Sequence, residues 1–180
     1  MLLPLLLGLL LTSQARAACS DPAAKASLDE DRLLGTWHNL RQTGVEAAAR
    51  CLRTEYSRAA ADHLAGLVAW YNTTSAAYSS LRLHMHKAVA GSADGQYEVH
   101  REDHQASYNG KLHIIDTDYD NYAVVWMCGT NPRSENTKEW YFLNTRQQHP
   151  SAEVLEQANR VLPAGDYSTT DQTDCPAYEH

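Results

Sequence analysis

The sequence predicts an all-β protein, an antiparallel sandwich or barrel with one helix near its C-terminus. Three observations favour this fold class: about eight short stretches of strand-forming residues follow one another, short turns join them, and one amphipathic helical stretch comes last. At 180 residues the chain suits one domain with a substantial core. No repeat, low-complexity tract or linker divides it.

The first predicted strands follow from their composition. Residues 33–43 hold a tryptophan and a glycine that permits close approach of another chain segment. Residues 51–57 follow an alanine-rich connection, and residues 66–74 are rich in the types that favour strands. Residues 79–89 alternate clearly between an apolar and a polar face. The apolar face carries Leu81, Leu83 and Met85, and the polar face carries Arg82, His84 and His86.

The second half of the strand series is joined by equally short turns. A glycine-containing turn at 90–95 leads into a strand at 96–102. Strands at 111–116, 122–128 and 137–146 follow it, which completes the antiparallel series.

Residues 149–165 break this pattern and predict a helix. Ser151 is placed to cap its start, and Pro163 with Gly165 ends it. A helix that follows a run of strands must pack its apolar side on the outside of the β structure. That apolar side consists of Val154, Leu155, Ala158, Val161 and Leu162.

An immunoglobulin-like sandwich is the competing fold. In that fold a tyrosine lies two residues before the second cysteine, whereas this chain has Trp126 two residues before Cys128. The late helix also has no place in such a sandwich. Both points favour the barrel.

The N-terminal segment, residues 1–17, is predicted to be a secretory signal peptide. Its leucine-rich core is short for a membrane span, and Ala15-Arg16-Ala17 has the small-x-small pattern of a cleavage site. A membrane anchor is the alternative interpretation of this segment. We therefore expect residues 18–180 to form the domain, and the protein to be secreted and extracellular.

Charge and cysteine content narrow the function classes. The net charge of −7, without a basic cluster, is poorly suited to nucleic acid or to an anionic membrane surface. Four cysteines in a secreted chain predict two disulfides, with three pairings open, and their spacing does not match a zinc finger. Asn72-Thr73-Thr74 is an N-glycosylation sequon, so we expect a glycan on Asn72.

Three short motifs resemble the signatures of the lipocalin family. Gly35-Thr36-Trp37 resembles the GxW motif, Thr117-Asp118-Tyr119 resembles the TDY corner, and Arg146 resembles the third signature. Their order and spacing agree across residues 18–180. Within the family the likeness is greatest to apolipoprotein D and to the lipocalins that bind bilins or carotenoids. Residues 50–57, 117–128 and 169–176 carry it.

The lipocalin resemblance implies an eight-stranded antiparallel up-and-down barrel with one flanking C-terminal helix. It implies that Arg146 lies over the indole of Trp37 at the closed end of the barrel. It also selects the disulfides Cys19–Cys128 and Cys51–Cys175 from the three pairings. The residues expected to close the barrel are Gly35, Trp37, Thr117, Asp118, Tyr119 and Arg146.

The same corner carries two carboxylates, Asp118 and Asp120, which could be taken for an acid/base pair. Turn chemistry explains both residues, because aspartate side chains bond to the backbone of their own turn. We therefore expect architecture at this corner and no catalysis.

The resemblance places a small-molecule pocket inside the barrel, where one ligand fits. Tyr56, Leu112 and Phe142 match pocket positions of the family. Strand alternation then adds Ile114, Ala123, Val125 and Trp140 to the predicted ligand-binding residues, and turns Trp126 outward.

The inward face of residues 79–102 stays open at this point. His84 and His86 share one strand face and could hold a haem iron or the propionates of a bilin. A solvated surface is the favoured interpretation, because the apolar face should point inward, and no metal site is predicted. The loop 44–50, expected to cover the entrance, lacks large apolar side chains, which favours carriage in free solution.

The resulting hypothesis is a secreted carrier of a small hydrophobic ligand: a lipid, steroid, retinoid, tetrapyrrole or carotenoid pigment. No cofactor is required, stable membrane insertion is not expected, and homo-oligomers are compatible with the sequence. The alternative is a lipocalin enzyme acting on a lipid through a thiol near the position of Cys51. The even number of cysteines leaves no thiol spare, so we expect a protein that is not an enzyme.

Overall fold

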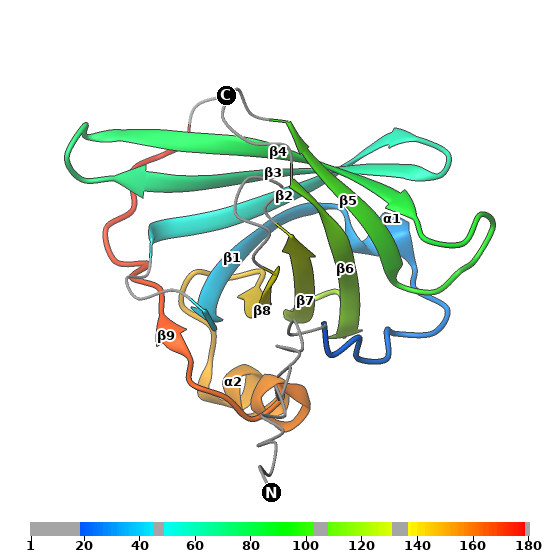
Figure 1. The fold of residues 1–180 in the computed structure, drawn as a ribbon. Coiled ribbons are helices and arrows are strands. Elements are labelled where there is room, and N and C mark those ends of the chain that lie inside the picture. Colours follow the sequence, from blue (N-terminus) through cyan, green and yellow to red (C-terminus); the bar gives the residue numbers. More distant parts are fainter. Residues whose placement is uncertain (1–18, 45–48, 103–107, 131–136, 179–180) are drawn as a thin grey trace, which may run out of the picture.

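The computed structural model describes residues 19–44, 49–102, 108–130 and 137–178. The predicted signal peptide at 1–17 and most of the predicted entrance loop at 44–50 lie outside the described residues. Figure 1 shows strands curving around a central space, with one helix packed on the outside.

Eight strands run antiparallel to their neighbours and close into a barrel. The sheet order is β2-β3-β4-β5-β6-β7-β8-β1-β9, and β1 also pairs with β2, which closes the ring. This confirms the predicted fold class. The strands are β1 Gly35–Gln42, β2 Arg50–Ala60, β3 His63–Asn72, β4 Ala77–Lys87, β5 Gln96–Glu102, β6 Tyr108–Thr117, β7 Tyr122–Thr130, β8 Thr137–Thr145 and the short β9 Ser168–Thr169.

Within the described ranges, two helices flank the barrel. The short helix α1 (Glu30–Leu33) precedes β1, and the side chain of its N-cap, Asp29, accepts a hydrogen bond from the backbone of Arg32. The helix predicted at 149–165 is α2 (Ala152–Val161), with Ser151 as its N-cap. Ala158 of α2 is fully buried against Tyr122, Val124 and Leu143 on the outer face of β7 and β8.

The interior divides into a packed floor and a hollow upper part. At the floor, Trp37 and Leu33 are fully buried together with Leu64, Met85 and Ile114. These side chains come from α1 and from strands on every side of the ring, so the closed end is solid apolar core. The open end of the barrel lies opposite this floor and leads into the cavity described below.

Two disulfides tie the terminal segments to the barrel. They join Cys19 to Cys128 and Cys51 to Cys175, the pairing that the resemblance implied. The N-terminal segment also covers the outer face of β6 and β7, where the carbonyl of Pro22 lies 2.7 Å from Nδ1 of His113. Trp126 faces outward as predicted and is nevertheless fully buried, against His113 and hydrogen-bonded to Glu139.

Candidate functional site

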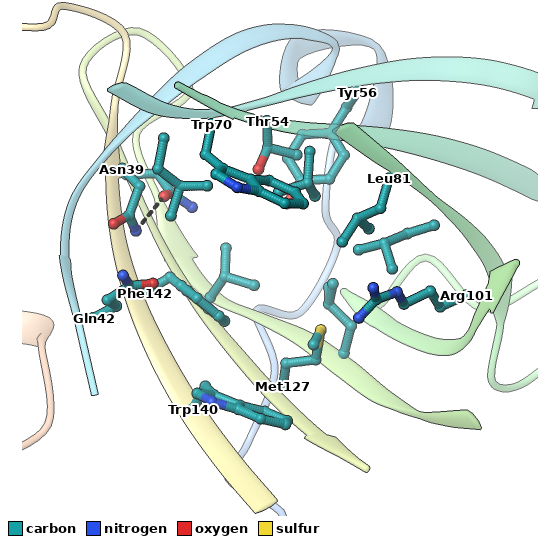
Figure 2. Close-up of a pocket in the computed structure, with 16 residues that line it drawn as sticks. Asn39, Gln42, Thr54, Tyr56, Trp70, Leu81, Arg101, Met127, Trp140 and Phe142 are labelled. Atoms are coloured by element: carbon teal, nitrogen blue, oxygen red, sulfur yellow. Dashed lines mark hydrogen bonds between the residues drawn. The ribbon is translucent and has the colours of Figure 1, made fainter. Parts of the chain in front are cut away.

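The upper part of the barrel encloses a cavity of about 300 Å³ that opens to one side. This volume is at the lower end of the range for small-molecule pockets. All eight barrel strands contribute side chains, and Figure 2 shows several of them pointing into the cavity. The lining residues are Asn39, Gln42, Leu52, Thr54, Tyr56, Val68, Trp70, Leu81, Leu83, Arg101, Leu112, Val125, Met127, Trp140, Phe142 and Asn144.

Strand alternation accounts for which side chains reach the cavity. Every second residue of β4 points inward, so Leu81 and Leu83 line the cavity and Met85 lies beneath them in the floor. The polar residues between them point outward. This settles the face of 79–89 that the sequence left open.

Five of the seven predicted ligand-contacting residues stand in the cavity wall: Tyr56, Leu112, Val125, Trp140 and Phe142. Ile114 and Ala123 point inward as predicted, yet they are fully buried in the floor beneath the cavity. Alternation fixes the face of a strand, but it does not fix the depth of a residue along the barrel axis.

Aromatic rings give the cavity flat apolar walls. Trp70, Trp140 and Phe142 line it from β3 and β8 and are only partly buried, so their faces are accessible to a guest (Figure 2). Gly44 adjoins Trp140 at the open end. Its φ is +73° and a Cβ there would lie 3.0 Å from the indole, so glycine is needed on both counts.

Tyr56 places a hydroxyl deep in the cavity wall. Only 4% of the residue is exposed, and burial raises the pKa of its phenol above the usual range. The ring packs against Gly66 of β3, where a Cβ would lie at an ordinary contact distance of 3.5 Å from Cε1 of Tyr56. The phenol is therefore a neutral group at physiological pH.

At one corner of the cavity, polar side chains form hydrogen bonds with other groups of the protein. The amide of Asn39 donates to Oδ1 of Asn144 at 3.1 Å, the interaction dashed in Figure 2. Oδ1 of Asn39 accepts from the hydroxyl of Thr170 at 2.6 Å. Gln172 donates to the carbonyls of Asn39 and Leu52. This network fixes the C-terminal segment against β1 and β2.

Among the described residues that line the cavity, Arg101 is the one with a charged side chain. It lies on β5, in register with Leu83 of β4, and shares its inward face with Tyr97 and Val99. Figure 2 shows its side chain reaching from the strand into the cavity. Arg101 was not among the predicted ligand-binding residues. Continuing the alternation from the buried Val99 would have found it.

At the closed end, the guanidinium of Arg146 lies 3.7 Å from the ring centroid of Trp37. The indole of Trp37 donates to the carbonyl of Leu33 at 2.8 Å. Gly35 has a φ of +91°, and a Cβ there would lie 3.4 Å from Arg146, which explains glycine at this position of the motif. Arg146 thus covers the floor.

The Thr117-Asp118-Tyr119 corner is held by its own hydrogen bonds. Asp118 Oδ1 accepts from the backbone N–H of Asn121 and Tyr122. Burial opposes its charge, yet these bonds and the amide of Asn121 keep the pKa of Asp118 below its usual value. Asp120 pairs instead with Arg32, at 2.8 Å. Both carboxylates are engaged in structure.

The histidines of β4 point away from the cavity. His84 and His86 lie on the outer face of the sheet beside His63 of β3, whose ring stacks on His86 at a centroid distance of 4.1 Å. Within the described ranges, three or more metal-ligating side chains are nowhere grouped so as to hold a metal ion.

All four cysteines of the chain are in disulfides, and Cys51 is one of them. The thiol that the enzyme alternative required at this position is therefore bonded to Cys175. Over the ranges that the structure covers, neither helix is of a length and hydropathy that would cross a membrane.

Residues 19–157 match the family model described as Triabin. The chain belongs to the triabin family and is a lipocalin. The Lazarillo protein of Schistocerca americana is 25% identical over 185 residues, which cover 97% of this chain and 85% of that protein.

Solved structures share the fold of this triabin-family chain. Insecticyanin from the tobacco hornworm Manduca sexta matches with a TM-score of 0.67 at 16% identity, over 89% of each chain. A biogenic amine-binding protein matches with a TM-score of 0.64 at 18% identity, over 79% of each chain. At these identities the likeness shows the fold alone.

Proposed function

We propose that this protein is a carrier that binds one small hydrophobic molecule inside its barrel. The observation that carries the proposal is the cavity itself. A closed barrel with a fully packed floor leaves about 300 Å³ open above it, lined mainly by aliphatic and aromatic side chains. A cavity with such walls is suited to an apolar guest, because transfer of apolar surface from water is favourable.

The free energy gained by burying apolar ligand surface in the cavity is enough for measurable binding. Burial of about 300 Å² of ligand apolar surface at ~25 cal/mol/Å² offers roughly 7 kcal/mol before ordering costs. A free energy of about 7 kcal/mol corresponds to a Kd of roughly 10 μM, so apolar burial alone supports at most binding in the micromolar range, without a covalent bond. Membership of the lipocalin family and a structural neighbour named for amine binding support a small-molecule role.

Binding at this cavity is tested with two adjacent positions on β3. Val68 lines the cavity, whereas Leu67 points to the outer face. We expect Val68→Trp to fill the cavity and weaken binding of all-trans-retinol at least tenfold, and Leu67→Trp to leave it within twofold. Near-UV circular dichroism checks that both variants fold. Equal binding by both variants would place the ligand elsewhere and overturn the proposal.

The native guest is identified by mass spectrometry and visible absorption of protein purified from its source tissue. A blue or orange protein indicates a bilin or carotenoid, and a colourless one that releases lipid on extraction indicates lipid. A protein that carries nothing and binds no hydrophobic probe would contradict the carrier function.

Secretion and glycosylation belong to the same proposal. Two disulfides suit an oxidising compartment. Asn72 lies at the turn between β3 and β4, where its Oδ1 accepts from the backbone of Thr74 and Ser75. A glycan there would stand at the open end of the barrel. Release of a glycan by an endoglycosidase, detected as a mass loss, tests the assignment.

The enzyme alternative has no support from a free thiol. Titration of the denatured, non-reduced protein should find zero thiols per chain, because the two disulfides together use all four cysteines. One reactive thiol would revive the alternative.

A further inference from the structure

The position of Arg101 makes the two ends of the cavity chemically different. Tyr97, which precedes Arg101 on the inward face of β5, is buried in the floor and its hydroxyl donates to Glu30 of α1. Arg101 is four residues farther along the same strand, near the end of β5. Its cationic side chain therefore lies above the floor, toward the open end, and the apolar depth of the cavity lies beneath it.

Arg101 brings a positive charge to the cavity wall. Among the described residues that line the cavity there is one arginine and no aspartate, glutamate or lysine; the rest are apolar or neutral polar. A guanidinium stays protonated at every physiological pH, and its planar fork matches a carboxylate with two parallel hydrogen bonds. In an apolar, partly enclosed space such a bond is stronger than in water.

We propose that the ligand of this carrier is an amphipathic acid, with an apolar body in the barrel and one carboxylate bound by Arg101. The inference rests on the proposed carrier function and narrows it to a chemical class. Trp70, Trp140 and Phe142 contact the body, and the acid group faces the open end. Fatty acids, retinoid acids and pigments with a propionate share this chemistry.

The same geometry disfavours amines. An ammonium group would meet the like charge of Arg101, and the described lining residues offer it no carboxylate. The cavity therefore differs in charge from one suited to a biogenic amine, although a protein named for binding such amines shares the fold.

The test uses three ligands with one body and three head groups: all-trans-retinoic acid, retinol and retinylamine. Their binding to the delipidated, disulfide-bonded protein is followed by quenching of tryptophan fluorescence, since Trp70 and Trp140 line the cavity. We expect the acid to bind on the order of tenfold more tightly than the alcohol, and the amine to bind most weakly.

Arg101→Met should bring the acid within about twofold of the alcohol and leave retinol affinity unchanged. Arg101→Lys keeps the charge without the fork and should retain part of the preference. Arg82→Met is the matched control, because Arg82 is exposed on the outer face of the neighbouring strand β4. It removes the same charge and should leave all three affinities unchanged. Thermal unfolding verifies that each variant is folded.

The outcomes separate the two proposals. Equal binding of acid and alcohol by the wild-type protein, or an acid preference that survives Arg101→Met, overturns the carboxylate assignment and leaves the carrier standing. Failure of all three ligands and of other hydrophobic probes overturns the carrier itself. If retinoic acid binds, its displacement by hexadecanoic acid or by biliverdin supports the carboxylate assignment. Which of the two competitors displaces it distinguishes a fatty acid from a pigment.

Discussion

The guanidinium of Arg146 lies 3.7 Å from the ring centroid of Trp37 and closes the barrel floor from outside. Its nitrogens also donate to four backbone carbonyls, those of Arg32, Leu34, Thr36 and Tyr119, at 2.7–3.1 Å. One side chain thus joins α1, β1 and the corner after β6. A planar, permanently charged group with several donors meets all these demands.

Removal of this group should therefore destabilise the protein strongly. We expect Arg146→Met to lower the free energy of unfolding by about 3 kcal/mol, because several hydrogen bonds and the cation–π contact are lost together. Arg146→Lys should lower the free energy of unfolding somewhat less, since lysine keeps the charge but lacks the planar guanidinium. Arg160→Met, at an exposed pair with Glu156, should cost under about 0.5 kcal/mol. Urea unfolding measures all three, and equal values for Arg146→Met and Arg160→Met would refute the closure role.

A second ionic cluster holds α1 against the barrel. Glu30 accepts from the hydroxyl of Tyr97 at 2.7 Å and pairs with Lys87 at 2.9 Å and Arg58 at 3.0 Å. The side chains of Glu30 and Lys87 are only 13% and 7% exposed. Hydrogen bonds from these partners outweigh the effect of burial and keep the pKa of Glu30 below its usual value.

Glu30→Ala should lower the free energy of unfolding by roughly 3 kcal/mol, because it leaves the largely buried Lys87 without this partner. The neighbouring residue supplies the control. Asp31 also pairs with Arg58, but its side chain is 82% exposed, so Asp31→Ala should cost under about 0.5 kcal/mol. Chemical denaturation of both variants decides the matter, and a loss below 1 kcal/mol for Glu30→Ala would contradict the prediction.

The outer histidine cluster should make stability depend on pH. Partial desolvation, and then the charges of His86 and His84, lower the pKa of His63 from its ordinary 6.5. The unfolded chain thus binds more protons than the folded protein near this pH, so stability is lost as pH falls through about 6.5. His38, whose pKa burial also lowers, acts in the same direction. Carboxylates titrate mainly at lower pH.

We therefore expect the melting temperature to fall between pH 7.5 and pH 5.5, and His63→Gln to reduce that fall. The melting curves of wild type and variant across this interval provide the measurement, with an NMR titration of the imidazoles as a direct check. An unchanged pH dependence in the variant would show the cluster to be uncoupled from stability, and a measured pKa of His63 above 6.5 would reverse the expected sign and contradict the prediction.

The closed end could be predicted from the sequence because its residues have narrow physical requirements. Gly35 needs a positive φ, and Thr117 and Asp118 satisfy the turn of their own corner. Such requirements leave short motifs with fixed spacing. The cavity wall has looser requirements, since any apolar side chain of suitable size serves. Only positions anchored to a motif, such as Phe142, could be placed.

Two kinds of cavity prediction differ from the structure. Ile114 and Ala123 were given the correct face but an incorrect height, because the depth of the packed floor depends on long-range packing around Trp37. Arg101 was missed because β5 carries charged residues on both faces, Glu98 outward and Arg101 inward. The pairing of Met85 with Val99 determines which face of β5 points inward, and this register depends on the closed ring.

Loss of a disulfide should weaken the fold without closing the cavity. The bond between Cys51 and Cys175 joins residues 124 apart, and the loop-entropy model assigns about 4–5 kcal/mol to a loop of this length. The hydrogen bonds of Gln172 to Asn39 and Leu52 still hold the C-terminal segment in the double variant Cys51→Ala/Cys175→Ala.

We therefore expect this variant to lose about 2–4 kcal/mol, less than the entropy model gives, and to retain retinol affinity within threefold below its unfolding transition. Adding Gln172→Leu should release the segment and increase the loss, because two carbonyls then lose their donor. Urea unfolding of the series, with retinol titrations alongside, measures both properties. If the double variant unfolds as easily as the triple one, the hydrogen bonds do not hold the segment, and the disulfide alone does.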